Sequence, residues 1–418
     1  MSNSRWNHLE GKTLDEIKNK TLEQIHFDKE EESHGLALHD KSIVIDSHFP
    51  GIGIKPYSEH IIKKMETRIE NGVSFGDLNK ELEGIIHEDI IYNPQMRDIY
   101  VGSWEKSGVT CANTCLWPPG DPGLIGAIKK IAESKYRIEN IRQLTNVLCA
   151  DDIIKAKQEG KYAILWNFED ANVIGGGFDI GNELDNLNLI YYLGIRVLSL
   201  TYNFRNLIGE GCLARQQSGL SHFGVRVVER MNELGMLIDV SHSGYQTTID
   251  AVDVSKTPIA TTHTASSTLF DNPRCKTDEE LISIAEKEGY IGVVMRPQYL
   301  GTKNTLNDFF DHLDYIIELV GVNHVGIGTA NAYRPFNSNI FPELNIKGLN
   351  NPISGSDWWL SGKYIRSIEA LNAVLNGPMS WINWPYYTVS LVNRGYSDNE
   401  IEGIIGGNFL EILERVIG

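Results

Sequence analysis

Two histidines stand at matching places in one stretch of the chain, and their spacing suggests a shared metal ion. The apolar run "MLIDVSH" ends in Ser241 and His242, and a second apolar run, "PIATTHT", carries Thr262 and His263 near its end. A helix-like segment separates the two runs, as expected for successive parallel strands. Because the carboxyl ends of neighbouring strands lie side by side, both imidazoles can bind one ion.

Two further runs end in groups that bind metals. Asp46 and His48 stand at the end of "SIVIDSH", while "YAILWNFE" ends in Glu169 and is followed by Asp170. A single histidine at a strand end is more often a hydrogen-bonded structural residue than a ligand. Three histidines together with a carboxylate favour zinc, which binds imidazole nitrogen and carboxylate oxygen. The predicted metal ligands are His48, Glu169, His242 and His263.

The elements that must position these groups alternate between short apolar runs and amphipathic segments. The runs are almost entirely apolar, which is typical of strands covered on both faces. Eight such strands alternating with helices predict an α/β fold, a closed (β/α)₈ TIM-type barrel whose strand ends meet in one mouth. The predicted strands are 42–48, 109–114, 162–169, 197–203, 236–242, 258–264, 290–297 and 324–331. His222 and His324 fall at a helix start and before a strand, so we expect them to be structural.

Two segments lie outside this alternation. Residues 1–40 are charged and helical in pattern, which predicts a helical arm packed on a barrel domain of residues 41–418. The stretch 332–382 is rich in Trp, Tyr, Gly and Asn, a composition that favours a lid or a subunit interface over a solvated loop. A homo-oligomer is expected for the same reason. The tryptophans expected to cover the mouth or a second subunit are Trp358, Trp359, Trp381 and Trp384. The last helical segment, 398–418, is expected to close the barrel.

Charge and cysteine content restrict the partners and the compartment. The 418 residues carry a formal net charge of −17, which argues against nucleic acid or an anionic membrane as a partner. The first twenty residues are too polar for a signal peptide, and the apolar runs are too short to span a membrane. Five scattered cysteines indicate reduced thiols and a cytoplasmic location. Cys111 and Cys115 lack the second pair that would favour a cysteine metal site.

Three signatures follow one another in "SGLSHFGVRVVERMNELGMLIDVSHSGYQT": Gly-Leu-Ser, Met-Asn-x-x-Gly-Met and Asp-x-Ser-His. In this order they resemble the renal (membrane) dipeptidase family of metallopeptidases, and the resemblance extends over most of the chain from about residue 40. It implies an amidohydrolase-like (β/α)₈ barrel that holds two zinc ions bridged by a glutamate. It also implies hydrolysis of small dipeptides and related amides.

The resemblance implies roles for five residues. His242 and His263 match the two histidines that bind one zinc, and Glu169 falls at the place of the bridging glutamate. His48 matches the histidine of the first strand. Arg274, in "NPRCKTDEEL", matches the arginine that holds the substrate carboxylate, for which a guanidinium provides a bidentate pair of donors. The alternative for Arg274 is a tether for a surface loop.

Four positions depart from the family pattern. Pro50 replaces an aspartate ligand of the first strand, so one or two zinc ions are expected. Tyr202 stands where the family has a histidine that stabilises the oxyanion, and a phenol can donate the same hydrogen bond. Ala330 replaces an aspartate beside the attacking water, and Arg296 adds a cation to the mouth. The carboxylates that could replace the missing ones are Asp46, Asp170 and Asp357.

These observations predict a cytoplasmic metal-dependent hydrolase whose small-molecule substrate carries a carboxylate and an amide bond, as a dipeptide does. Zinc lowers the pKa of its water ligand towards neutrality, and Glu169 or Asp170 is expected to act as general base. Tyr202 is expected to polarise the carbonyl and, with Arg274 and Arg296, to contact the substrate. The alternatives are a specialised amidohydrolase-type enzyme that does not act on dipeptides, and a catalytically silent barrel that binds a small ligand.

Overall fold

Eight parallel strands follow one another around a barrel in chain order, as the sequence predicts. The structure is a computed structural model that describes residues 14–53, 58–73, 75–116, 123–175, 180–333, 374 and 377–418. Each predicted strand contains or overlaps an observed one, because a run that is buried on both faces leaves a clear apolar signal. The strands are β1 (Ile45–Phe49), β2 (Cys111–Cys115), β4 (Tyr162–Phe168), β5 (Val197–Ser199), β6 (Leu237–Asp239), β7 (Ala260–Thr264), β8 (Tyr290–Val294) and β9 (Val325–Gly328).

The barrel closes where the chain beyond β9 meets β1. The backbone N–H of Ala330 donates to the carbonyl of His48 at 2.9 Å, and Ile52 and Tyr333 form a parallel bridge just beyond. Asp46 strengthens this closure, because its carboxylate accepts from both the N–H and the hydroxyl of Thr329. The predicted closed barrel is therefore confirmed.

A short strand that the sequence did not predict, β3 (Leu144–Asn146), joins this sheet beside β4. It pairs with the first half of β4, at Tyr162, while β5 pairs with the last half, at Asn167. Its sequence Leu-Thr-Asn lacks the apolar run from which β5 and β6, strands of the same length, were recognised.

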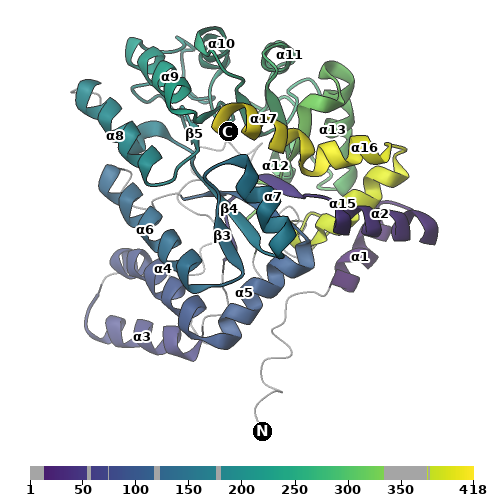
Figure 1. Cartoon of the computed structure of the whole chain (residues 1–418), viewed down its shortest axis with the longest axis horizontal. Coiled ribbons are helices and arrows are strands. Elements are labelled where there is room, and N and C mark those ends of the chain that lie inside the picture. The colour runs from purple at the N-terminus through teal and green to yellow at the C-terminus, as the bar shows by residue number, and fades with distance from the viewer. Residues whose placement is uncertain are drawn as a thin grey trace.

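Helices surround the barrel (Figure 1). Those between β1 and β5 are α3 (Glu59–Glu70), α4 (Phe75–Tyr92), α5 (Pro94–Ser107), α6 (Leu124–Asn140), α7 (Ala150–Glu159) and α8 (Ile180–Tyr192), with the 3₁₀ turn η1 (Ala171–Ile174). Those between β5 and β9 are α9 (His222–Leu234), α10 (Tyr245–Val254), α11 (Asp278–Glu286), α12 (Pro297–Leu300) and α13 (Leu306–Val320), with η2 (Val322–His324). A capping box stands at the start of α11, where the side chains of Thr277 and Glu280 each accept from the other's backbone N–H.

The strands bury side chains on both of their faces. Leu165 of β4 points into the barrel, and the adjacent Trp166 points outward into the layer between the strands and the helices. The last helix, α17 (Asn408–Ile417), follows α16 (Asp398–Glu402) and the π-helical turn η7 (Gly403–Gly407). Its residues Phe409 and Leu413 pack with the interior residues of the barrel and close the end at which the strands begin. Figure 1 shows α17 near the centre of this face, as the sequence predicts.

The N-terminal arm is helical and packs on the outside of the molecule. It consists of α1 (Leu14–Leu22) and α2 (Lys29–Lys41), and α2 lies beside α15 (Trp384–Asn393), far along the chain (Figure 1). The two helices approach closely at Gly35, where an added Cβ would lie 2.7 Å from the Cα of Val389. The sequence predicts an arm that spans residues 1–40, of which residues 1–13 lie outside the described part of the chain.

Only the edges of the predicted lid or interface segment, 332–382, can be compared with the structure. Residues 334–373, which include Asp357, Trp358 and Trp359, lie outside the described part. For Trp381 and Trp384 the prediction is wrong. Both are at most 1% exposed and are buried against the chain itself, in the turn η6 (Trp381–Asn383) and at the start of α15. Trp381 stacks on Phe49 with ring centroids 4.3 Å apart, so its aromatic surface belongs to the core.

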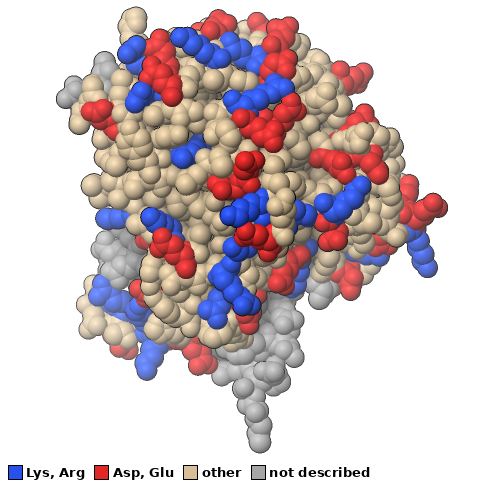
Figure 2. Space-filling view, viewed as in Figure 1, with Lys and Arg blue, Asp and Glu red and all other residues tan. Residues whose placement is uncertain are grey.

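Charged side chains of both signs share the surface. Among the described residues of the face in Figure 2, acidic and basic groups are interspersed. The described helices include none that is both long and apolar enough to cross a membrane.

Candidate metal centre

The four predicted metal ligands meet at the carboxyl ends of their strands. His48 belongs to β1 and His263 to β7, while Glu169 directly follows β4 and His242 lies just beyond β6. Their Nε2 atoms surround one oxygen, Oε1 of Glu169, at 3.0 Å from His48 and 3.4 Å from each of His242 and His263. The tertiary structure thus brings together four groups that the chain separates by up to about half its length.

These distances are those of ligands around one ion. A tetrahedral zinc site with bonds of about 2.0–2.1 Å has ligand atoms about 3.3 Å apart. The two nitrogens of His242 and His263 are 3.1 Å apart, and those of His48 and His263 lie within 4.8 Å of each other and of the Glu169 oxygen. The donor set of three imidazoles and one carboxylate suits zinc, so the residues present fit the metal.

The environment of the nitrogens also favours a cation. His48 is 1% exposed, and neither of its ring nitrogens makes a well-formed hydrogen bond with the part of the chain described. The Nδ1–H of His242 donates to Oδ1 of Asn203 at 2.7 Å, which leaves the lone pair of Nε2 directed at the Glu169 carboxylate. Lone pairs that face one another at this distance repel unless a cation lies between them.

Two hydrogen-bond partners orient the imidazoles and were not recognised from the sequence. Asn203 holds His242, and the hydroxyl of Thr262 lies 3.0 Å from Nδ1 of His263. Such partners fix the tautomer and orientation of a metal-binding histidine. The signal available was their position, because Asn203 lies just beyond β5 and Thr262 precedes a predicted ligand. The His48 ring stacks on that of His263, with centroids 3.8 Å apart.

Burial and the neighbouring charges keep His242 and His263 neutral, and the imidazoles keep Glu169 ionised. Burial, followed by the charge of Arg274, lowers the pKa of His242 below its ordinary value, and burial and His48 do the same for His263. Burial alone would raise the pKa of Glu169, but the neighbouring imidazoles, above all His48, hold it well below its ordinary value. Neutral imidazole and ionised carboxylate are the forms that bind metal.

The two described carboxylates that could replace the missing ligand are already occupied. Asp46 accepts from Thr329, from the N–H of His48 and from Nε1 of Trp381, so it is part of the barrel closure rather than a free ligand. Asp170 caps η1 through the N–H of Asn172 and accepts from Asn206. Burial, together with Glu169, raises the pKa of Asp170.

Tyr202, the predicted oxyanion donor, lies against the metal ligands. Its ring stacks on that of His242 with centroids 4.3 Å apart. Burial, followed by the charge of Glu169, raises the pKa of its hydroxyl, so Tyr202 is a neutral hydrogen-bond donor at physiological pH.

The two predicted substrate-binding arginines differ in environment. Arg274 is 2% exposed, and its guanidinium donates to the carbonyls of Ser241 and His263, directly beneath the ligands. Its Nε is buried without a partner among the described residues. Arg296 is half-buried and donates from Nε to the carbonyl of Ala330 at 2.6 Å. Their contacts with substrate stay predictions.

Cys115 lies at the opposite oxygen of Glu169. Its Sγ is 3.6 Å from Oε2, whereas the three imidazoles surround Oε1. Cys111 is buried in the barrel core at the other end of β2, about 13 Å away at the usual rise per residue. The two cysteines therefore do not form a metal pair.

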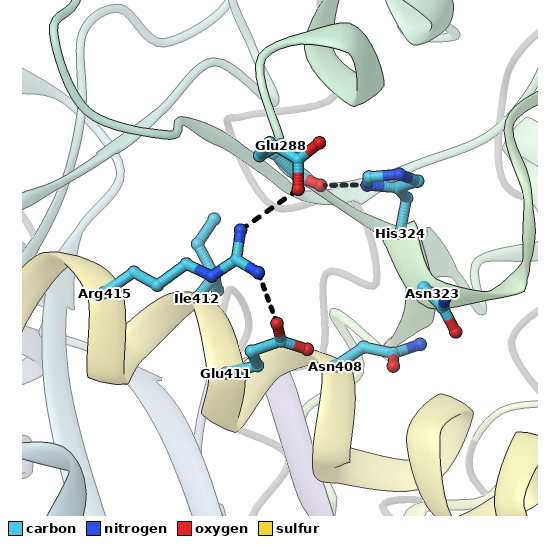
Figure 3. A pocket seen from close by; sticks show the side chains of 8 residues that line it. Glu288, Asn323, His324, Asn408, Glu411, Ile412 and Arg415 are labelled. Carbon is cyan, nitrogen blue, oxygen red and sulfur yellow. Dashed lines mark hydrogen bonds and ion pairs between the residues drawn. The ribbon is translucent and has the colours of Figure 1, made fainter.

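A separate cavity of about 270 Å³ lies at the other end of the barrel, where β8 and β9 begin. Figure 3 shows Arg415 between Glu288 and Glu411, and His324 directed at a backbone carbonyl, that of Gly289. These groups form ion pairs and hydrogen bonds with one another, as is typical of structural residues. His324 is therefore structural, as predicted, and His222 begins α9 as predicted.

Comparison with known proteins agrees with this geometry. The family model of the membrane dipeptidases, peptidase family M19, matches residues 125–335, about half of the chain. The chain belongs to peptidase family M19. Relatives in this family include an uncharacterised dipeptidase of Schizosaccharomyces pombe, 32% identical over 190 residues, which cover 43% of this chain and 44% of that protein. Dipeptidase 3 of Mus musculus is 25% identical over 254 residues, which cover 58% of this chain and 43% of the relative.

Solved structures show the same fold as this M19 chain. An amidohydrolase from Pseudomonas aeruginosa has a TM-score of 0.66 at 24% identity, covering 91% of this chain and 98% of that one. A metallopeptidase from Rhodobacter sphaeroides has a TM-score of 0.61 at 16% identity, covering 90% of this chain and all of that one. The chain spans less than half of the length of the two curated relatives above, so only the family and the fold carry over directly.

Proposed function

We propose that this protein is a zinc-dependent hydrolase that cleaves an amide bond in a small, carboxylate-bearing, dipeptide-like molecule. The observation that carries the proposal is the convergence of three imidazole nitrogens on one carboxylate oxygen in the mouth of an M19 barrel. The relatives named above are called dipeptidases, and the Rhodobacter sphaeroides structure holds a phosphinate mimic of the dipeptide L-Ala-D-Ala.

The side chains at and around the ligands transfer the proton, polarise the carbonyl group and bind the substrate carboxylate. Bound zinc supplies a Lewis acid and lowers the pKa of a water molecule towards neutrality. We assign proton transfer to a carboxylate at the end of β4, Glu169 or Asp170. The neutral Tyr202 hydroxyl donates to the carbonyl oxygen as negative charge develops there. Arg274 holds the substrate carboxylate, for which its unpartnered Nε is available.

The substrate is specialised rather than an ordinary dipeptide. Ala330 can neither accept a proton nor pair with an ammonium group, and the guanidinium of Arg296 lies against its carbonyl. A free α-amine would meet a positive charge there instead of a carboxylate. A substrate that is acylated on nitrogen, or that carries a second acidic group, is therefore preferred.

We infer the compartment from the cysteines and the assembly from exposed apolar side chains. All five cysteines are free, which supports a reducing location such as the cytoplasm. Side chains such as Tyr92, Ile125 and Tyr192 are at least 60% exposed, and exposed apolar groups of this size support a homo-oligomer.

Hydrolysis assays test the function directly. Zinc-loaded protein is given L,L- and L,D-dipeptides beside their N-acylated and acidic analogues. N-acylated or acidic substrates should turn over fastest, and simple dipeptides about a hundred- to ten-thousand-fold slower, the usual effect of losing a positioned general base. Simple dipeptides turning over fastest would contradict the argument from Ala330 and Arg296.

A substitution of Tyr202 separates an enzyme from a silent binding barrel. Tyr202→Phe keeps the ring that stacks on His242 and removes only the hydroxyl, so kcat should fall about a hundred- to a thousandfold while KM changes little. Tyr192→Phe, which alters an exposed hydroxyl, serves as the control. An absence of turnover for every substrate, with zinc bound, would favour the silent barrel.

A further inference from the structure

A second cavity, of about 350 Å³, opens beside the metal centre and runs between the barrel and helices α4, α5 and α6. Its walls at the mouth include Pro50, Thr114 and Cys115, at the carboxyl ends of β1 and β2. The Cys115 thiol lies 3.6 Å from Oε2 of Glu169, so a residue in the wall of the cavity contacts the carboxylate of the metal centre. Its volume falls in the range of small-molecule sites, about 300–1,000 Å³. We call it the helix-side cavity.

The middle of the helix-side cavity is apolar. Trp104 of α5, Leu116 beyond β2 and Ile90 of α4 are among the side chains that line it. Surfaces of this kind bind the hydrocarbon part of a ligand, because they remove it from water.

The far end of the cavity is polar and cationic. Lys130, Ser134 and Arg137 lie at positions i, i+4 and i+7 of α6, so one face of the helix presents them together. His87 of α4 lines the same end. Lys130 pairs with Glu133 at 3.1 Å, whereas Arg137 lies over the Tyr100 ring at 5.6 Å and has no carboxylate within ion-pair distance among the side chains described. Among the described residues, the half-buried Arg137 guanidinium therefore has an aromatic neighbour but no carboxylate partner.

Buried polar atoms in the walls lack partners as well. The hydroxyl of Ser134 and Nε1 of Trp104 have no hydrogen-bond partner among the described residues, although both residues are only 1% exposed. Nδ1 of His87 is in the same condition. A buried donor left unsatisfied is destabilising, so such donors in residues that line a cavity favour a ligand with acceptor atoms.

We propose that the helix-side cavity binds an apolar chain of the substrate and that Arg137 and Ser134 bind an anionic group, such as a carboxylate, at the far end of that chain. The site rests on the proposed function for its connection to the metal centre. It narrows the substrate class to amides whose acyl or side chain is a medium-length hydrocarbon ending in a carboxylate. The negative charge pairs with the guanidinium, and the Ser134 hydroxyl donates to the same group.

Binding measured by calorimetry on the full-length, zinc-loaded protein tests this site without turnover. The probes are octanoate and its uncharged analogue 1-octanol. Octanoate should bind, and Arg137→Gln should weaken it about tenfold or more while leaving 1-octanol unchanged. Lys135→Gln, an exposed lysine of the same helix, is the matched control and should change neither. Failure of octanoate to bind, or equal affinity in Arg137→Gln, would overturn the proposal.

Two further variants close the remaining alternatives. Octanoate could bind the metal instead, so it is also titrated into His242→Ala/His263→Ala. If this double variant still binds octanoate in an Arg137-dependent way, the result supports binding in the cavity. Loss of octanoate binding in the double variant overturns the proposal. Ser134→Leu should fill the cavity and abolish binding of both probes. This variant keeps the test available if Arg137→Gln does not fold. Wild-type affinity of Ser134→Leu for octanoate would also overturn the proposal. Arg137-dependent binding without any hydrolysis would leave the cavity standing and reject the proposed function.

Discussion

At the scale of single residues, the site depends on which atom of each side chain faces the centre. His48, His242 and His263 all direct Nε2 at the same oxygen of Glu169. Asn203 enforces this orientation for His242, because it takes the Nδ1 proton. The departure at Ala330 is also local: its φ of 51° is rare for a residue other than glycine, and its N–H and carbonyl are held by His48 and Arg296.

Replacing two of the ligands should remove the metal without unfolding the barrel. His242→Ala/His263→Ala leaves two ligand atoms, too few for tight zinc binding, whereas the strands that carry them stay buried on both faces. Elemental analysis should find the zinc gone while the circular dichroism stays that of the parent. His222→Ala, at an exposed position, should keep its zinc. Equal zinc content in the double variant and the parent would refute the assignment.

At the scale of elements, the N-terminal arm is joined to the rest of the fold through a buried histidine. His39 of α2 lies with Nδ1 2.8 Å from the Thr388 hydroxyl of α15 and Nε2 2.9 Å from the Ser107 carbonyl at the end of α5. Gly108 follows in the left-handed conformation at φ 64°, and a Cβ there would lie 2.5 Å from the imidazole. Only glycine lets the three helices meet around this ring.

His39 should make stability depend on pH. Burial is the main cause that lowers its pKa from 6.5 to about 4, so the unfolded chain binds the proton first. Its contribution is complete above about pH 6.5 and is lost as the pH falls towards 4, a change of about 3 kcal/mol at most. Denaturant unfolding at pH 7.5 and 4.5 should show a smaller loss in His39→Gln than in the parent. His26→Gln, at an exposed position before α2, is the control and should leave the loss unchanged; an equal loss in all three proteins would contradict the argument.

At the scale of the whole molecule, the two ends of the barrel have separate tasks. The metal centre and the opening of the helix-side cavity lie at the carboxyl ends of the strands, and α17 fills the opposite end with Phe409 and Leu413. The packing at one end therefore does not constrain the chemistry at the other. This separation is usual in (β/α)₈ barrels.

Shortening the Leu413 side chain, which helps to close the end of the barrel remote from the ligands, should lower the stability and leave the metal centre intact. Leu413 is completely buried, so Leu413→Ala should lower the free energy of unfolding by about 2–5 kcal/mol. The zinc content of the folded variant should equal that of the parent, because Leu413 packs at the end remote from the ligands. Glu414→Ala, at the adjacent exposed position, should change stability by less than about 0.5 kcal/mol. A loss of zinc in Leu413→Ala would mean that the two ends are coupled.

The amino-acid sequence by itself determined the eight strands, the barrel and the set of candidate metal ligands that meet in its mouth. Strands buried on both faces leave apolar runs, and the groups that follow them must meet in one mouth because all the strands point the same way. His242 and His263 were therefore recognisable from their positions alone as candidate ligands.

Only the tertiary structure decided the surroundings of these groups, because they depend on contacts between residues distant in the chain. Composition placed Trp381 in a lid or an interface, but it packs on Phe49 and donates to Asp46, more than three hundred residues away in the chain. Asp46 was a candidate ligand because it stands near the end of a strand, but its carboxylate is occupied by Thr329 in the barrel closure. Cys115 and Arg137 carry no local signal of a shared cavity, since their relation arises only when α6 packs beside the end of β2.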